Sequence, residues 1–201
     1  MAEKINYNKG NNISSVAFMF ACPGQKEQEA GRVVAGNTGK NLDRLLSSLS
    51  HSFNIKIRNL FPSANRYDYL ITNASDIIHY PALDGKSLPL KTEYMKEENI
   101  ERLCEELKET KFVVAFGTQA KEVSAAVAEA YKRNKIDRHP IFITSLPHLS
   151  FLSLNQISHD VNGERIMKGD REGTEKRIEV VKERMEKEIE HLLQKSLYKN
   201  I

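Results

Sequence analysis

Polar side chains stand at three predicted strand ends: the loop after Phe20, which contains Glu27, then Asn73, and the loop around His148. A carboxylate can orient water and stabilise positive charge, and an imidazole can donate a hydrogen bond to an oxygen that gains negative charge. A carboxamide offers a donor and an acceptor in one plane, which suits reading the edge of a flat ligand. Because the carboxyl ends of parallel strands meet at one edge of a sheet, we predict that these side chains line one pocket.

The first of these strands is predicted over residues 16–20 and runs into Pro23-Gly24. A polar loop with three further glycines follows, and apolar residues of helical spacing then predict a helix from about Gly39 to Ser50. A strand, a glycine-rich loop and a helix form the arrangement in which α/β proteins hold a ligand beyond a strand end. The loop is therefore the first place where we expect chemistry.

Strands and helices alternate along the rest of the chain. Further strands are predicted over 69–72, 112–116 and 141–145, and further helices over 96–108, 118–133 and 174–197, with Thr118 as an N-cap. The unbroken apolar run 112–116 suits a parallel strand that is covered on both faces. The alternation predicts an α/β fold of three layers, α/β/α, with a central, mainly parallel, four-stranded sheet.

The connecting segments are less regular. Residues 1–12 indicate a loose lead-in, 74–91 a loop, and 151–171 an extended excursion with a hairpin turn at Asn162-Gly163. Residues 51–67 carry no clear pattern. The amphipathic helix 174–197 is interpreted as docked on the sheet, and a coiled-coil dimer arm is the alternative.

Composition limits the classes of protein to which the chain can belong. The 201 residues, 40% hydrophobic and 28% charged, suit a single domain over residues 1–201, and no apolar run is long enough for a membrane span. The polar start favours the cytoplasm, and a monomer is expected. Cys22 and Cys104 are too few for a metal or cluster site and are interpreted as reduced thiols. The net charge of +3 fits a nucleic-acid partner only weakly.

The motifs together resemble one family. Pro23-Gly24-x-x-Glu27-x-x-x-Gly31-Arg32-x-x-x-Gly36-x-x-Gly39 resembles the first motif of the uracil-DNA glycosylase superfamily, closest to its families 4 and 5. Ile71-Thr72-Asn73 resembles the second motif, and the 112–117 segment looks like the third strand. His148-Leu149-Ser150 resembles the His-Pro-Ser motif after the fourth strand. The resemblance spans residues 16–155 in the family's order.

Three departures from the family pattern bear on the chemistry. The four cysteines of the family 4 iron–sulfur cluster are absent, so we predict no cofactor. The acidic residue that commonly opens the first motif is missing, which makes Glu27 the best acidic candidate. Val33-Val34 stands where the family usually has Pro-Phe, whose ring stacks on uracil. This exchange predicts a larger pocket.

The resemblance implies a monofunctional DNA glycosylase that flips out a pyrimidine and leaves an abasic site, since no lysine stands at the motif positions. The implied catalytic residues are Glu27, for water and the sugar cation, and His148, for the base oxygen. Base-binding residues would be Asn73, Val34, Gly24 and Cys22. DNA-binding residues would be Arg32, Gly36, Lys40, Ser145, Leu149, Ser150 and Phe151, with Leu149, Phe151 and Leu152 as candidate wedges.

Other interpretations remain open. Glu27 can be a surface carboxylate, His148 and Asn73 can cap local turns, and the candidate wedges can be core residues. The substrate can be uracil or an enlarged pyrimidine, such as the glucosylated hydroxymethylcytosine of phage DNA, which would mean antiviral defence. A non-catalytic DNA- or nucleotide-binding protein on the same fold is the alternative from another class. A Rossmann-type enzyme ranks low because no GxGxxG follows the first strand.

Overall fold

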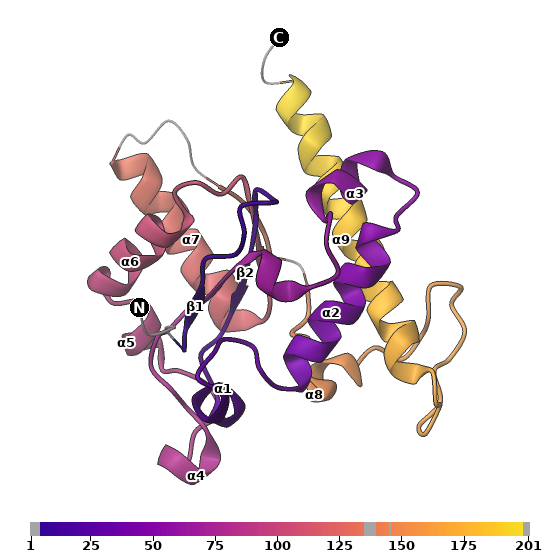
Figure 1. Cartoon of the computed structure of the whole chain (residues 1–201), viewed down its shortest axis with the longest axis horizontal. Helices are drawn as coiled ribbons and strands as arrows, with labels where there is room; N and C mark the ends of the chain where they lie inside the picture. Colours follow the sequence, from indigo (N-terminus) through magenta and orange to yellow (C-terminus); the bar gives the residue numbers. More distant parts are fainter. Residues whose placement is uncertain (1–4, 135–139, 145, 199–201) are drawn as a thin grey trace.

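The computed structural model describes residues 5–134, 140–144 and 146–198. In these residues five strands form one sheet in the order β1-β3-β2-β4-β5 (Figure 1). Their bounds are β1 Tyr7–Asn8, β2 Val16–Phe20, β3 Leu70–Asn73, β4 Phe112–Ala115 and β5 Ile141–Ile143. β2 to β5 run parallel, and β1 pairs antiparallel with β3. The predicted α/β architecture is confirmed, with a fifth strand at one edge.

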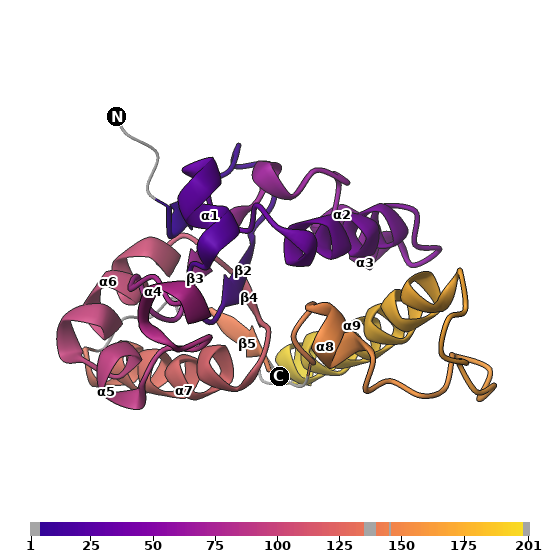
Figure 2. The same cartoon turned by 90° about the horizontal axis from the view of Figure 1, so that it is seen from below.

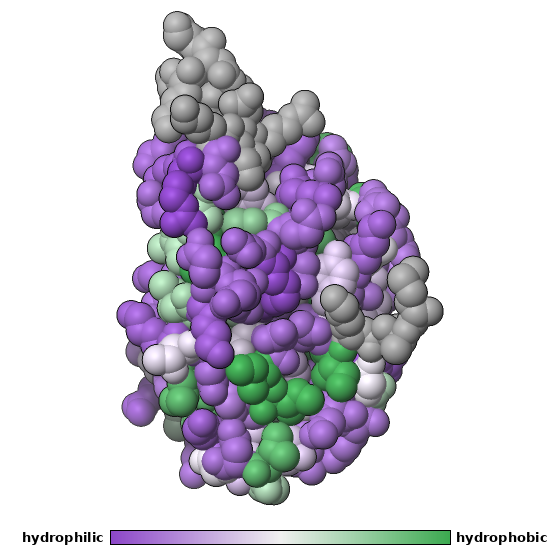
Figure 3. All heavy atoms as spheres, turned by 90° about the vertical axis from the view of Figure 1, so that its left-hand side faces the viewer, coloured by the Kyte–Doolittle hydropathy of each residue, from purple (hydrophilic) through white to green (hydrophobic). Residues whose placement is uncertain are grey.

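Helices cover both faces of the sheet (Figure 2). Their bounds are α1 Gln25–Ala30, α2 Asn37–Ser50, α3 Ile55–Leu60, α4 Pro81–Asp84, α5 Lys91–Tyr94, α6 Glu97–Leu107, α7 Thr118–Arg133, α8 Phe151–Leu154 and α9 Gly173–Tyr198, with a 3₁₀ turn, η1, at Arg66–Asp68. None of the helices in the described residues is long and apolar enough to cross a membrane. The face in Figure 3 is mostly hydrophilic, with a hydrophobic group at the level of α4 and α5.

Strand β2 divides the core because its side chains alternate between the two faces. Phe18 and Phe20 join a cluster with α2 and α9, while Ala17 and Met19 join a second cluster with α6 and α7. All five residues of β2 are buried, as expected of a central parallel strand. The sheet is therefore held rigidly between two apolar layers.

The strand register brings the predicted site residues to one edge. Phe20 pairs with Asn73, and Met19 pairs with Ala115, so β2, β3 and β4 end together. Figure 2 looks onto this edge, where α1, α4 and α8 lie. The segments that follow these strand ends must therefore surround one region.

The long helices form as their patterns predict. Leu42, Leu45, Leu46 and Leu49 of α2 are all buried. Helix α9 packs its apolar side against α2, with Ile178, Val181, Met185 and Ile189 buried. Ser52 Oγ donates to Glu186 Oε1 at 2.6 Å across this contact. Helix α9 is docked as interpreted, but mainly on α2, with a smaller contact to strand β5 of the sheet.

Several local predictions are wrong. The lead-in contains β1, which depends on distant contacts: Asn8 Nδ2 donates to the carbonyl oxygens of Tyr67 and Tyr69 at 3.0 and 2.7 Å. The glycine-rich loop contains α1, and the predicted loop 74–91 contains α4. Neither short helix buries a residue, so neither leaves an apolar period in the sequence.

The structure differs from the prediction at the start of α7 and agrees with it in the connection between α8 and α9. Gly117, at φ +89°, occupies the N-cap position, so Thr118 is the first helical residue and not the cap. In the connection between α8 and α9, the predicted turn is confirmed: Gly163 has φ +81°, and Asp160 N–H donates to Glu164 O at 2.8 Å.

Candidate active site

A pocket of about 150 Å³ opens at the carboxyl edge of the parallel strands. It is lined by Phe20, Ala21, Cys22, Gly24, Glu27, Val34, Thr38, Asn73, Ser87, Leu88 and His148. Glu27, Asn73 and His148 thus lie in one pocket, and all four predicted base-binding residues line it too. Drug-sized ligands occupy sites of roughly 300 to 1,000 Å³, so this pocket suits a group about as large as one base.

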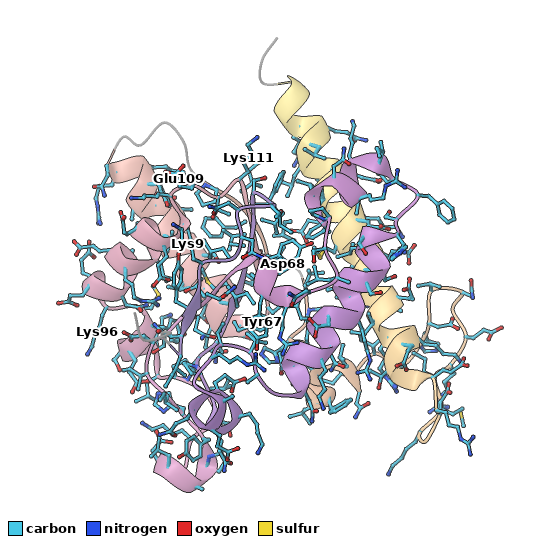
Figure 4. All side chains as sticks on the ribbon, viewed as in Figure 1. Lys9, Tyr67, Asp68, Lys96, Glu109 and Lys111 are labelled. Carbon is cyan, nitrogen blue, oxygen red and sulfur yellow. The ribbon has the colours of Figure 1, made fainter. Side chains whose placement is uncertain are left out.

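Two larger cavities lie elsewhere. One of about 620 Å³ lies between α6 and α7, and one of about 500 Å³ is lined by Lys9 and Glu109, at the end of the sheet away from α1 (Figure 4). Neither contains a predicted site residue. In α/β sheets ligands bind beyond the carboxyl ends of the strands, so the small pocket is the better candidate despite its size.

Glu27 is fixed by the backbone of the glycine-rich loop. Its Oε2 accepts from Gly24 N–H at 3.0 Å, which closes the first turn of α1, and its Oε1 accepts from Gly36 N–H at 3.3 Å. Glu27 is the half-buried residue of a helix whose other residues are exposed. Each carboxylate oxygen has a second lone pair, so the group can still accept from water.

His148 is held as a neutral hydrogen-bond donor. Its Nδ1 accepts from Ser150 N–H at 3.1 Å, which places the proton of the neutral ring on Nε2. Burial lowers the pKa of His148 from 6.5 to about 4, although the nearby charge of Glu27 acts in the opposite direction. At neutral pH the ring therefore presents an uncharged Nε2–H.

The ring of His148 is also fixed by its neighbours. Phe20 meets it edge-on, with ring centroids 5.8 Å apart, and Gly117 lies beneath it. A Cβ on Gly117 would meet His148 atoms at 3.5 Å, and the φ of +89° there disfavours any side chain. Three strand ends thus set the direction of one imidazole.

The lowered pKa of His148 predicts a pH dependence of stability. As pH falls from 6.5 to about 4, the imidazole takes up a proton in the unfolded chain but not in the folded one. The free energy of unfolding therefore falls by roughly 3 kcal/mol over this pH window, and protonation of His148 lowers it no further at lower pH. Urea unfolding at several pH values should show a shallower loss in His148→Gln than in the wild-type protein; equal losses would contradict the assignment.

Asn73 ends β3 with its side chain buried. Its Nδ2 lies 3.4 Å from the Asn6 carbonyl oxygen, a long hydrogen bond that a ligand can replace with a shorter one. Arg102 Nη2 donates to the Asn73 carbonyl oxygen at 2.8 Å and fixes the strand end. The amide is therefore positioned by the sheet and not by a flexible loop.

Val34 has a strained backbone in the pocket wall. Its φ of +50° is rare for a β-branched residue, and strain of this kind tends to occur at functional sites. This backbone conformation requires glycine at position 39, because a Cβ on Gly39 would lie 1.9 Å from the Val34 carbonyl oxygen. The start of α2 is thus packed directly against the pocket.

Cys22 contributes a thiol and not a thiolate. Burial raises its pKa to about 12, and the neighbouring carboxylates act in the same direction. A neutral thiol is a weak donor and a poor nucleophile. Both cysteines are free, and no group of three or more His, Cys, Asp or Glu in the described residues could hold a metal ion.

None of the predicted DNA-binding residues in the described part of the chain is among those that line the pocket. Arg32 is exposed and stacks over the Tyr67 ring at 4.9 Å (Figure 4 labels Tyr67), and Lys40 is exposed on α2. Gly36 is the N-cap of α2. Ser150 caps α8, where its Oγ accepts from Ser153 N–H at 3.4 Å. Ser145 lies outside the described residues.

One candidate wedge is wrong. Leu149 is fully buried, and its carbonyl oxygen accepts from the buried Asn41 Nδ2 at 2.8 Å. Phe151 and Leu152 on α8 are 44% and 79% exposed. Those two side chains, and not Leu149, are exposed to solvent.

The sequence did not point to Thr38, Ser87 or Leu88. Thr38 lies in the first turn of α2, and Ser87 and Leu88 come from the segment between α4 and α5. Ser87-Leu88-Pro89 carries no periodicity, and its place beside the pocket depends on long-range contacts of the preceding residues. A local signal for these residues is therefore not expected.

The family model described as the Uracil DNA glycosylase superfamily matches residues 10–165, well over half of the chain. This stretch includes strands β2 to β5 and every residue that lines the pocket. No curated protein matches the chain. The family resemblance predicted from the motifs is confirmed.

Proposed function

This chain belongs to the uracil DNA glycosylase superfamily, and from this premise we propose that it hydrolyses the N-glycosidic bond of a pyrimidine in DNA. Family membership supports an activity of the DNA glycosylase type. The proposal adds that the target base is a flipped pyrimidine, that water is the nucleophile and that an abasic site is the product. We also propose that the protein acts in the cytoplasm as a monomer.

The proposal rests on the protonation state of His148, a neutral imidazole with its proton on Nε2. The base leaves with negative charge on a carbonyl oxygen, and the Nε2–H of a neutral, half-buried imidazole is a preorganised donor for that charge. A charged imidazolium would instead lie beside the positive charge that develops on the sugar. A neutral donor therefore suits both halves of the transition state.

Glu27 and Asn73 take the remaining parts of the reaction. As the bond between the base and C1′ breaks, the Glu27 carboxylate stabilises the positive sugar and orients a water molecule towards C1′. The water oxygen bonds to C1′ and loses a proton, while the departing base takes one up from solvent. Asn73 holds the flipped base through its amide, which donates and accepts in one plane.

The identity of the base depends on the pocket wall. Val34 lines the pocket where a stacking phenylalanine is usual in the family, which favours a base with an added group. The volume of about 150 Å³ holds the ring, so a bulky group such as glucose must extend through the mouth. We therefore propose two substrates, uracil and glucosylated hydroxymethylcytosine, of which the second implies defence against phage.

Abasic-site formation, read by alkaline cleavage of labelled DNA, tests the proposal. A uracil duplex and genomic DNA of a phage with glucosylated hydroxymethylcytosine are compared, with His148→Ala purified in the same way to exclude a contaminating glycosylase. Cleavage of the uracil strand supports repair, and cleavage of the phage DNA alone supports defence. Cleavage of neither would contradict both substrates.

A non-catalytic DNA-binding protein is the second candidate. One observation favours it: both oxygens of Glu27 already accept backbone N–H groups, and Ala21 stands where the family's acidic residue is missing. Glu27 would then be a structural residue of the loop. Tight DNA binding without any base release in the same assay would support this candidate.

Arg32→Ala should weaken DNA binding in a salt-dependent way. Arg32 is exposed and stands two positions before Val34 of the pocket wall, and loss of one phosphate contact should lower the slope of log K against log salt by roughly 0.9. Fluorescence anisotropy between 50 and 300 mM salt measures this slope. Lys108→Ala, on the far α6–α7 side, is the control, and equal slopes for both variants would remove Arg32 from the interface.

A further inference from the structure

Four exposed apolar side chains stand between Ile77 and Leu90, in the stretch that follows β3. We define this apolar ridge as Ile77, Leu83, Leu88 and Leu90, which are 39%, 51%, 50% and 48% exposed. Figure 3 shows the hydrophobic group at the level of α4 and α5, within a hydrophilic face. Leaving several large apolar side chains together in water is unfavourable, so such a group marks a contact surface.

The ridge is continuous with the pocket. Leu88 is half exposed and also lines the pocket beside His148 and Asn73. Helix α4 lies at the same edge of the sheet as α1 and α8 (Figure 2). A DNA strand that delivers a base into the pocket must therefore pass over Leu88.

A buried histidine holds the ridge in place. His79 Nδ1 contacts Asp84 Oδ2 at 2.5 Å, and its Nε2 contacts Glu93 Oε2 at 2.9 Å, so the ring ties together the two ends of the segment 84–93. Glu93 also accepts from Leu90 N–H at 2.7 Å. His79 N–H donates to the Pro23 carbonyl oxygen at 3.1 Å, which links the segment to the pocket loop.

Two lysines, each beside a carboxylate, flank the ridge. Lys86 and Lys91 precede and follow Leu88 and Leu90, and their side chains are 40% and 72% exposed. Each also contacts a carboxylate, Asp84 at 4.0 Å and Glu122 at 3.5 Å, and keeps donors free for a phosphate. Apolar side chains between lysines suit unstacked bases with their phosphates on either side.

We propose that the apolar ridge binds the unstacked bases next to the flipped nucleotide, on the opposite side of the pocket mouth from Phe151 and Leu152 of α8. The inference rests on the proposed function, because it needs a base in the pocket. The ridge and α8 then act as two apolar contacts that keep the neighbouring bases from closing over the gap. His79 is the positioning residue that keeps the ridge rigid.

The double variant Leu83→Ala/Leu90→Ala tests the ridge without touching the pocket, since neither residue lines it. Loss of two half-exposed leucines should weaken binding to single-stranded DNA by roughly tenfold to fiftyfold. The salt slope should stay unchanged because no charge is removed. Ile55→Ala, 52% exposed on α3, is the matched control and should bind like the wild-type protein.

A fluorescent adenine analogue beside the target reports unstacking directly. Its fluorescence should rise when the wild-type protein binds and rise less with the double variant and with His79→Gln. Binding and fluorescence equal to those of Ile55→Ala would overturn the inference. Base release by the wild-type protein is scored separately, so a failure of the proposed reaction is distinguished from a failure of the ridge.

Discussion

Replacing His148 by alanine should lower the single-turnover rate of base release by roughly 10² to 10³-fold. The Nε2–H is aimed by the bond from Ser150 N–H to Nδ1 and by the contact with Phe20. It therefore needs little reorganisation when charge develops on the base. The same donor meets less charge in the ground state, so the dissociation constant for DNA should change by less than about threefold.

The measurement pairs rapid-quench kinetics with anisotropy titrations at one salt concentration. His148→Gln is the matched control, because its amide can donate a hydrogen bond from a similar distance and should recover part of the rate. The wild-type rate should also show no loss from protonation of His148 until the pH approaches 4. Equal losses in rate and affinity would assign His148 to binding and contradict the proposed role.

Gly39→Ala should destabilise the protein and disrupt the pocket. In an ordinary helix this change stabilises by up to about 1 kcal/mol. Here the new Cβ would lie 1.9 Å from the Val34 carbonyl oxygen and 2.8 Å from Arg66 Nε. The carbonyl belongs to a backbone already at φ +50°, so relief requires α2 or the pocket wall to move. We expect a net loss of roughly 2 to 3 kcal/mol.

Gly31→Ala separates this clash from simple backbone strain. Gly31 has φ +67°, but a Cβ there would meet nothing within 4 Å. Its cost should therefore be only the roughly 1 to 2 kcal/mol of a left-handed residue. Urea unfolding of the two variants compares these costs, and base release reports the pocket. A Gly39→Ala protein as stable as Gly31→Ala, or more so, would show that the loop can move freely.

The order of elements was predictable because each strong pattern is local. The run 112–116 is apolar throughout, and the leucines of α2 repeat at helical spacing, so both the strand and the helix follow from neighbouring residues. The parallel arrangement then brings Glu27, Asn73 and His148 to one edge, as their places after three strands predict. The family motif adds the expected chemistry.

The short elements were not predictable, because distant groups stabilise them. Strand β1 exists through its pairing with β3 and through the Asn8 side chain. Helix α1 closes on the Glu27 carboxylate and buries no apolar residue. Leu149 looks like a wedge in the sequence, but Asn41, 108 positions earlier, holds its carbonyl oxygen inside the protein.

By itself, the sequence determined the α/β class, the family and the three polar side chains at the strand ends, since these depend on residue type and local spacing. Only the tertiary structure decided the tautomer of His148, the anchoring of Glu27 and the position of the apolar ridge. Each of these depends on burial or on a hydrogen bond between groups that are brought together by folding. Such contacts leave no periodic pattern in the sequence. They form, and contribute to stability, only once the sheet and its helices have packed.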